Sequence, residues 1–145
     1  MSTPTPEQAL AVQQLVHEYG FRNDHGQADR LHELVTEDYT STGPMGTMNG
    51  REALRTWGRA RLSNTSQVRH VLSNLRVFVE DGVLRATSYY VAYRDTGANP
   101  AVPASVGEYH DTFAVVDGEL RLAAREVVPV FTNPDAPRPV IGAPK

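Results

Sequence analysis

The stretch SVGEYHDTFAVVDGELRLAAREVVPVF, residues 105–131, decides the fold of this chain. Apolar and polar residues alternate on both sides of Asp117-Gly118, which is the pattern of two half-buried β-strands. Asp-Gly between two such segments is a strong hairpin signal, because both turn positions adopt positive φ. We therefore predict strands over residues 105–116 and 119–131, joined by a two-residue turn.

A second Asp-Gly pair, Asp81-Gly82, separates two further alternating segments, residues 67–80 and 83–94. Four long strands in succession, joined by tight turns, indicate an antiparallel meander. The segment between the two hairpins, residues 95–104, contains Gly97, Pro100 and Pro103. We expect it to form a loop at the mouth of a cavity.

The N-terminal third of the chain has helical periodicity instead. A first helix is predicted to begin at Pro6 with Thr5 as its N-cap, and a second to span residues 28–35. A short strand over residues 36–42 precedes a third helix, for which Asn49 is the expected N-cap. Helices that cover one face of an antiparallel sheet define an α+β class. We predict a cone: a curved antiparallel sheet with three N-terminal helices enclosing a cavity.

Length and composition limit the remaining possibilities. The chain has 145 residues, the usual size of one domain, which we place at residues 1–132 with a proline-rich tail over 133–145. The net charge is −3 without a basic block, which argues against nucleic acid as a partner. No apolar run is long enough to span a membrane and no signal peptide is recognisable, so we expect a cytoplasmic protein.

Two histidines lie within predicted strands and are the best candidates for chemistry. Strict alternation places His70 on one face of its strand together with Leu72, Asn74 and Phe78. A mostly apolar face with a few polar groups is typical of a ligand cavity. His110 occupies a comparable position in the hairpin strand, and for both histidines a purely structural role is the alternative.

Asp24 is the main carboxylate candidate, and it follows the first predicted helix. An aspartate there commonly just ends the helix. Beside a cavity histidine, it could instead fix the imidazole tautomer and raise its basicity. A base in its own right is a third possibility, if burial raised its pKa.

The ordered set of segments resembles the SnoaL-like family of the nuclear transport factor two-like superfamily, which has a cystatin-like fold. The segments that carry the resemblance are NDHGQADRLHELVTEDY (23–39), GREALRTW (50–57), RHVLSN (69–74) and GEYHDTFAVVDGELRLAAREV (107–127). The similarity extends from about Glu7 to Phe131, and it is greatest to scytalone dehydratase and hexachlorocyclohexane dehydrochlorinase. In both, an aspartate after the first helix and a histidine that opens the first long strand form a catalytic dyad.

The resemblance implies roles for four residues. Asp24 and His70 match the dyad, Tyr39 falls near a water-binding tyrosine, and His110 stands where scytalone dehydratase has another active-site histidine. The chain departs from that pattern at Asn23, where the dehydratase has an active-site tyrosine.

From these residues we predict a lyase or isomerase, dehydratase-like, that works without cofactor or metal. His70 would be the general base and His110 would protonate the leaving group, while Tyr39 and Asn74 would hold the substrate oxygen. A small, largely apolar and perhaps cyclic substrate would contact the expected wall residues Trp57, Leu72, Phe78, Tyr89 and Val91. A polyketide or terpenoid cyclase using the same dyad, and a non-catalytic binding module, are the alternatives.

A homodimer or homotrimer is also expected, because sheets of this kind usually leave one face uncovered. The face that carries Tyr109, Phe113 and Val115 is the predicted interface, since large exposed apolar patches usually mark interfaces.

Overall fold

The computed structural model describes residues 1–95 and 102–136. Its sheet has six strands in the order β2-β1-β6-β5-β4-β3. The strands are β1 Val35–Gly43, β2 Gly46–Asn49, β3 Val68–Glu80, β4 Val83–Arg94, β5 Pro103–Val116 and β6 Glu119–Thr132. The four predicted long strands are therefore confirmed, whereas most of the predicted 95–104 loop and of the 133–145 tail lies outside the described residues.

Three helical segments accompany the sheet: α1 Pro6–Asp24, the 3-10 helix η1 Ala28–Leu34 and α2 Arg51–Arg61. Thr5 caps α1 as predicted, with its hydroxyl accepting a hydrogen bond from the backbone N–H of Gln8. The N-cap of α2 is Gly50 rather than Asn49, and the second helix is a 3-10 helix instead of an α-helix. None of the described helices is long and apolar enough to cross a membrane.

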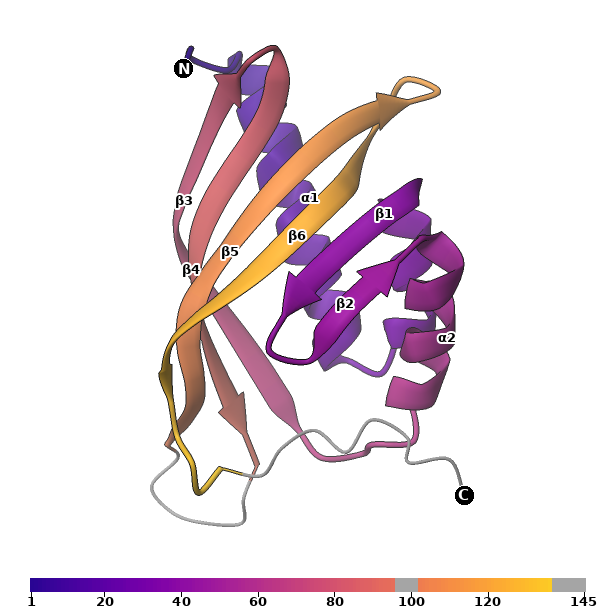
Figure 1. Cartoon of the computed structure of the whole chain (residues 1–145), viewed down its shortest axis with the longest axis vertical. Coiled ribbons are helices and arrows are strands. Elements are labelled where there is room, and N and C mark those ends of the chain that lie inside the picture. Colours follow the sequence, from indigo (N-terminus) through magenta and orange to yellow (C-terminus); the bar gives the residue numbers. More distant parts are fainter. Residues whose placement is uncertain (96–101, 137–145) are drawn as a thin grey trace.

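The sheet is mixed, although a wholly antiparallel sheet was predicted. The strand β1 pairs antiparallel with β2 and parallel with β6. Four strands and α2 lie between β1 and its parallel neighbour β6 in the chain, so no local sequence signal reports this long-range pairing. Figure 1 shows the long strands β3–β6 side by side, with β1 and β2 continuing the sheet toward α2.

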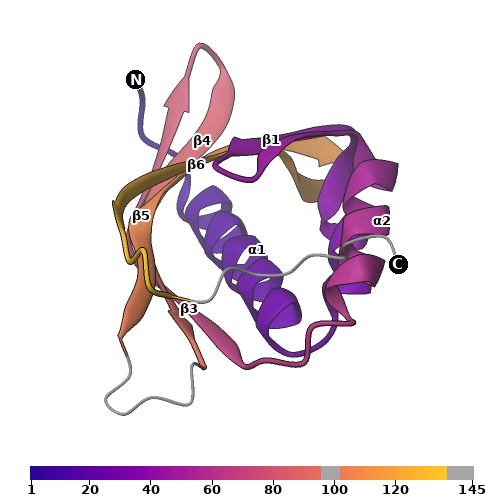
Figure 2. The same cartoon turned by 60° about the horizontal axis from the view of Figure 1, so that its bottom comes forward.

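The helices lie on the concave side of the curved sheet. Figure 2 shows α1 running along this side, with α2 across from it. We call the side of the sheet that faces α1 the inner face and the opposite side the outer face. The cone predicted from the sequence is confirmed in its main features, a strongly curved sheet with helices on one side.

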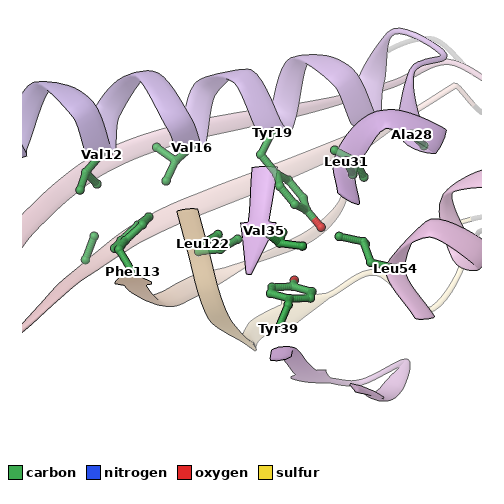
Figure 3. Packing of buried hydrophobic residues seen from close by; sticks show 11 residues of the cluster. Val12, Val16, Tyr19, Ala28, Leu31, Val35, Tyr39, Leu54, Phe113 and Leu122 are labelled. Atoms are coloured by element: carbon green, nitrogen blue, oxygen red, sulfur yellow. The ribbon is translucent and has the colours of Figure 1, made fainter. Parts of the chain in front are cut away.

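The hydrophobic core fills the space between α1 and the inner face. Buried residues of the helices meet buried residues of β1, β4, β5 and β6 there (Figure 3). The cluster consists of Val12, Val16, Tyr19, Ala28, Leu31, Val35, Tyr39, Leu54, Ala86, Phe113 and Leu122. Burial of this apolar area is the main term that holds the helices on the sheet.

A β-bulge interrupts the alternation of β3. Asn74 has a φ of 52°, and the pairing of β3 with β4 shifts between Ser73 and Arg76. The bulge inserts one residue, so side chains beyond it point to the opposite face from the one that simple alternation assigns. Leu75 and Val77 therefore pack against the core, and Phe78 lies on the outer face.

Gly58 allows α2 to lie directly on the backbone of η1. A Cβ at this position would stand 2.0 Å from the carbonyl oxygen of Ala28 and 3.1 Å from the Cα of Asp29. Backbone atoms cannot move aside as a flexible side chain can, so Gly58→Ala must push the two helices apart. We expect it to lower the free energy of unfolding by about 1–3 kcal/mol or more, as overpacking does.

Urea unfolding followed by circular dichroism measures this loss. Gly20→Ala is the matched control, because Gly20 lies in α1 and a Cβ there meets nothing within 4 Å. Equal stabilities of the two variants would show that the close approach of α2 to η1 is wrong.

Candidate active site

Asp24 and His70 form a hydrogen-bonded pair at the end of the molecule where α1 ends and β3 begins. The Nδ1 of His70 lies 2.6 Å from Oδ1 of Asp24, and the backbone N–H of His70 donates to Oδ2 at 2.8 Å. Both side chains are largely buried, with exposed fractions of 5% for Asp24 and 13% for His70. One carboxylate thus holds both the backbone and the ring of the histidine.

The pairing determines which ring nitrogen is available for chemistry. An ionised carboxylate only accepts hydrogen bonds, so the Nδ1 of His70 carries the proton. Its Nε2 then has the free lone pair, and within the described residues this nitrogen makes no hydrogen bond. The arrangement presents a basic nitrogen whose ring orientation is fixed by two contacts.

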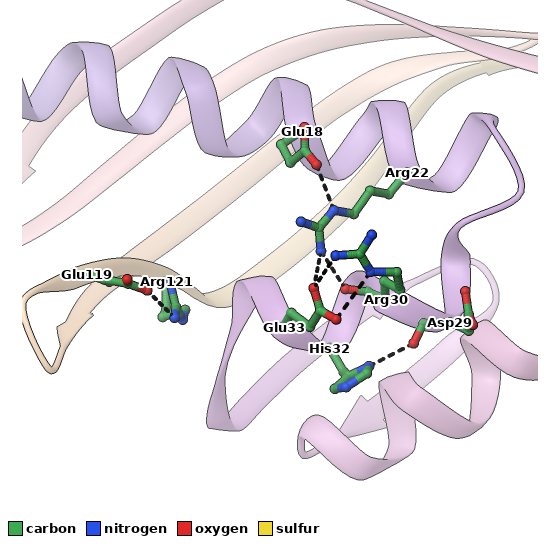
Figure 4. Close-up of polar contacts among 8 residues, drawn as sticks. All are labelled: Glu18, Arg22, Asp29, Arg30, His32, Glu33, Glu119 and Arg121. Atoms are coloured by element: carbon green, nitrogen blue, oxygen red, sulfur yellow. Dashed lines mark hydrogen bonds and ion pairs between the residues drawn. The ribbon is translucent and has the colours of Figure 1, made fainter.

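Asp24 is held in place by the anchored end of α1. It is the last residue of the helix, and the backbone N–H of His25 caps the turn by donating to the carbonyl of Phe21. Arg22, in the last turn of α1, donates to Glu18 at 2.7 Å and to Glu33 of η1 at 2.8 Å (Figure 4). This network ties the end of α1 to η1, which limits the movement of the catalytic candidate.

His70 is held by the pairing of β3 with β4. It lies opposite Ala92, and the buried residues of β4 show that this position faces inward. The residue before it, Arg69, reaches back with Nη1 to the backbone carbonyl of Asp24 at 3.4 Å. Three separate contacts therefore join Asp24 to residues 45 and 46 positions further along the chain.

Two tyrosines stack on the inner face of the sheet. The rings of Tyr90 and Tyr109 lie 4.6 Å apart, and the Tyr90 hydroxyl is 3.0 Å from that of Ser105. Burial raises the pKa of the Tyr109 phenol well above its usual range, so this hydroxyl stays protonated, although Arg125 acts in the opposite direction. The charge of Asp24 also raises the pKa of Tyr109, which means that this phenol lies within electrostatic range of the dyad.

A buried ion pair adjoins the tyrosines. Arg125 of β6 donates from Nε and Nη2 to the two carboxylate oxygens of Asp111 of β5, at 2.8 and 2.7 Å. The guanidinium carbon lies 4.0 Å from the centre of the Tyr109 ring and 4.8 Å from that of Tyr19. Burial by itself lowers the pKa of Arg125. The neighbouring Asp111 carboxylate raises it by more than this, so the net shift is upward and the pair remains charged.

Tyr109 and Arg125 were not predicted as site residues from the sequence. Alternation on β5 groups Tyr109 with Asp111, but it does not tell which face turns inward. The polarity of the opposite face of β5 is the sequence signal that could have found them. That face carries His110 and Glu108 and is too polar to form a core, so the face with Tyr109 and Asp111 is the one that turns inward.

Four predicted site residues lie on the outer face, away from the dyad. His110 is exposed, with Nε2 2.8 Å from Glu108, and it cannot protonate a leaving group at His70. Tyr89 and Val91 alternate with the buried residues of β4, and Phe78 was moved outward by the bulge. The structure therefore does not bring His110 and these three predicted wall residues together with the dyad.

Two other predicted residues belong to the core. Tyr39 is fully buried in β1, and its hydroxyl faces that of Tyr19 (Figure 3). Trp57 of α2 packs against the same cluster. Neither residue contacts the dyad within the described part of the chain.

Leu72 and Asn74 line a groove of about 620 Å³ between the first half of α1 and the bulge of β3. Its other walls include Leu10, His17 and Ser88. Leu72 shares the inner face with His70, whereas Asn74 forms the bulge itself and is exposed. Neither dyad residue lines this groove.

The predicted oligomer interface is wrong in its main residues. Tyr109 and Phe113 lie on the inner face, where Phe113 belongs to the hydrophobic core. Val115, near the end of β5, is exposed.

Comparisons with known proteins place this geometry in context. The model of the SnoaL-like domain matches residues 5–126. A variant of Rv3472, a protein of unknown function from Mycobacterium tuberculosis, has a TM-score of 0.78 at 24% identity, with 96% of this chain and 84% of that chain covered. No curated protein matches the sequence.

Two structures from Novosphingobium aromaticivorans are also similar. A protein provisionally assigned as a scytalone dehydratase has a TM-score of 0.75 at 22% identity, over 93% of this chain and 95% of that one. A nuclear transport factor two-like protein with a cystatin-like fold has a TM-score of 0.69 at 26% identity, over 86% and 82%. Because the family model spans most of the chain, this protein belongs to the SnoaL-like domain family.

Proposed function

We propose that the protein is a lyase or isomerase that removes a proton next to a carbonyl group of a small molecule. The observation that carries this proposal is the double contact of Asp24 with His70, through the ring at 2.6 Å and the backbone at 2.8 Å. The backbone contact holds the carboxylate in place, and the ring contact then presents Nε2 in one direction, as a general base requires.

In the proposed reaction, Nε2 of His70 takes the proton from the carbon, and Asp24 stabilises the imidazolium that forms. The carbon–hydrogen electron pair moves toward the carbonyl, giving an enolate. Returning the proton at another carbon gives an isomer, and loss of a leaving group gives the product of a lyase. Histidine suits this role because imidazole ordinarily titrates near neutral pH.

The surroundings of the dyad change the substrate expected from the sequence. Most of the predicted apolar wall lies on the outer face or in the core. The inner face offers the aromatic rings of Tyr90 and Tyr109 and buried guanidinium groups instead. A planar substrate with polar substituents fits this surface better than a wholly apolar one, and a cyclase acting on such a substrate would use the same base.

Exchange of carbon-bound protons in D₂O tests the proposal without knowledge of the full reaction. A panel of small cyclic ketones and keto acids is incubated with the protein, and loss of the α-proton signal is followed by NMR. Asp24→Asn should slow the exchange by about ten- to a hundredfold, because it removes a charge-assisted hydrogen bond to the imidazolium.

His110→Ala is the control, since that histidine lies on the outer face and should leave the exchange rate unchanged. If Asp24→Asn exchanged protons as fast as the unaltered protein, or if no compound of the panel exchanged, the proposal would be abandoned in favour of a binding module.

A further inference from the structure

Arg61 is a buried cation that has no acidic partner in the part of the chain that the structure describes. It is the last residue of α2 and continues the buried stripe that contains Leu54 and Gly58. Only 7% of the residue is exposed, yet its one described side-chain hydrogen bond runs from Nη1 to the backbone carbonyl of Asn64, at 3.1 Å. Within the described residues, no carboxylate lies within ion-pair distance of it.

Arg94 of β4 is a second cation on the inner face, and it is half-buried. It alternates with Ala92, the residue opposite His70, and therefore points to the same side of the sheet. On neighbouring strands, such a diagonal position lies about 7–8 Å from its partner. Among the described contacts, the Arg94 side chain makes no ion pair and no hydrogen bond.

The two arginines act on each other. Burial lowers the pKa of Arg94, and the charge of Arg61 lowers it further, whereas Asp24 and Tyr109 raise it. The acid that influences Arg94 is thus Asp24, whose carboxylate is already committed to His70. The partial negative charge at the end of α2 offsets only a small part of the cost of burying Arg61.

An unpaired buried charge is expensive, and proteins normally pair it or remove it. Here Arg94 lies diagonally across from His70 and within electrostatic range of Arg61, whereas the buried Arg125 is paired with Asp111. The counter-charge that the described residues do not supply to these two side chains is one that a bound molecule can bring. Guanidinium groups match carboxylate and phosphate geometry well.

We propose that Arg61 and Arg94 bind an anionic group of the substrate, a carboxylate or a phosphate, next to the Asp24–His70 dyad. As a statement about the substrate it rests on the proposed function, whereas the binding site itself does not. The anion would fix one end of the molecule, which places a carbon a few bonds away against Nε2 of His70.

The test compares anionic probes with neutral ones of the same shape. Binding of benzoate, phenyl phosphate and benzamide is measured by titration calorimetry at constant ionic strength. Benzoate, phenyl phosphate or both should bind more tightly than benzamide. Arg61→Gln and Arg94→Gln should each weaken anion binding by about tenfold or more, the loss expected for one charge-assisted hydrogen bond. Preference for phenyl phosphate over benzoate would assign the group as a phosphate, and the reverse a carboxylate.

Arg59→Gln is the matched control, because Arg59 lies on the same helix, carries the same charge and is exposed. Equal losses in this variant would show general attraction of anions, and would overturn the proposal. So would equal binding of benzoate, phenyl phosphate and benzamide, or unchanged binding in both test variants.

Stability gives an independent readout. Replacing an arginine that supports the structure destabilises the fold. Replacing a cation that is kept for a ligand does not, because the replacement removes charge repulsion and the cost of burying the charge. Arg94→Gln should therefore leave the melting temperature unchanged or raise it, and a clear decrease would contradict the proposal. His70→Asn separates the two proposals: anion binding should persist in it while proton exchange is lost.

Discussion

Replacing His70 by alanine should slow proton exchange by about 10²–10⁴-fold, the contribution typical of a positioned general base. The loss should exceed that of Asp24→Asn, because the aspartate only orients and stabilises the ring that does the chemistry. The measurement is the same exchange in D₂O, with rates determined over a range of pH. The unaltered protein should follow the titration of one base, and the variant should lose that dependence.

The variant must be shown to be folded, because the Asp24 carboxylate would lose its ring partner. His70→Gln keeps a side chain that can donate to Asp24 and is the better folded comparison. Both variants should be inactive while His110→Ala stays active. An active His70→Gln variant would assign the base to another group.

Asp111→Ala should lower the free energy of unfolding by about 3–5 kcal/mol, the cost of leaving one partner of a buried ion pair uncompensated. Arg125 would keep its charge among Tyr19, Tyr109 and the core, with only 7% of its side chain exposed. Urea unfolding at 25 °C measures the change. If the variant does not fold, the double variant Asp111→Leu with Arg125→Met still provides the test.

That double variant should be far more stable than Asp111→Ala, because it removes both charges and keeps the volume. Glu37→Gln is the control: it breaks the ion pair with Arg51 at the surface, where 86% of Glu37 is exposed, and should cost less than about 1 kcal/mol. A double variant as unstable as the single one would mean that the pair is needed for packing rather than for charge balance.

The local features of the fold could be predicted from the sequence, and the distant pairings could not. Both Asp-Gly turns form as expected, with positive φ at Asp81 and Asp117, because a two-residue hairpin depends only on neighbouring residues. The parallel pairing of β1 with β6 depends on the closure of the whole sheet. No window of sequence contains that information.

The site could be predicted as far as the dyad. The positions of Asp24 and His70 follow from the end of a helix and the start of a strand, which sequence patterns mark. Arg61 and Arg94 were not predicted, because nothing in the sequence around either residue indicates a binding site. Arg61 ends an arginine-rich helix, and Arg94 ends a strand. Their significance lies in what surrounds them in space, where no carboxylate of the described residues pairs with them.

The bulge at Asn74 has a consequence for how β3 can vary. Because of the one inserted residue, every side chain after it points to the opposite face of the sheet from the one that strict alternation would give, while the side chains before it keep their face. The half of the strand that carries His70 and the half that carries Leu75 and Val77 can therefore diverge as separate units. In a relative that lacks the extra residue, the histidine would stay on the inner face, but the residues equivalent to Leu75 and Val77 would point to the outer face.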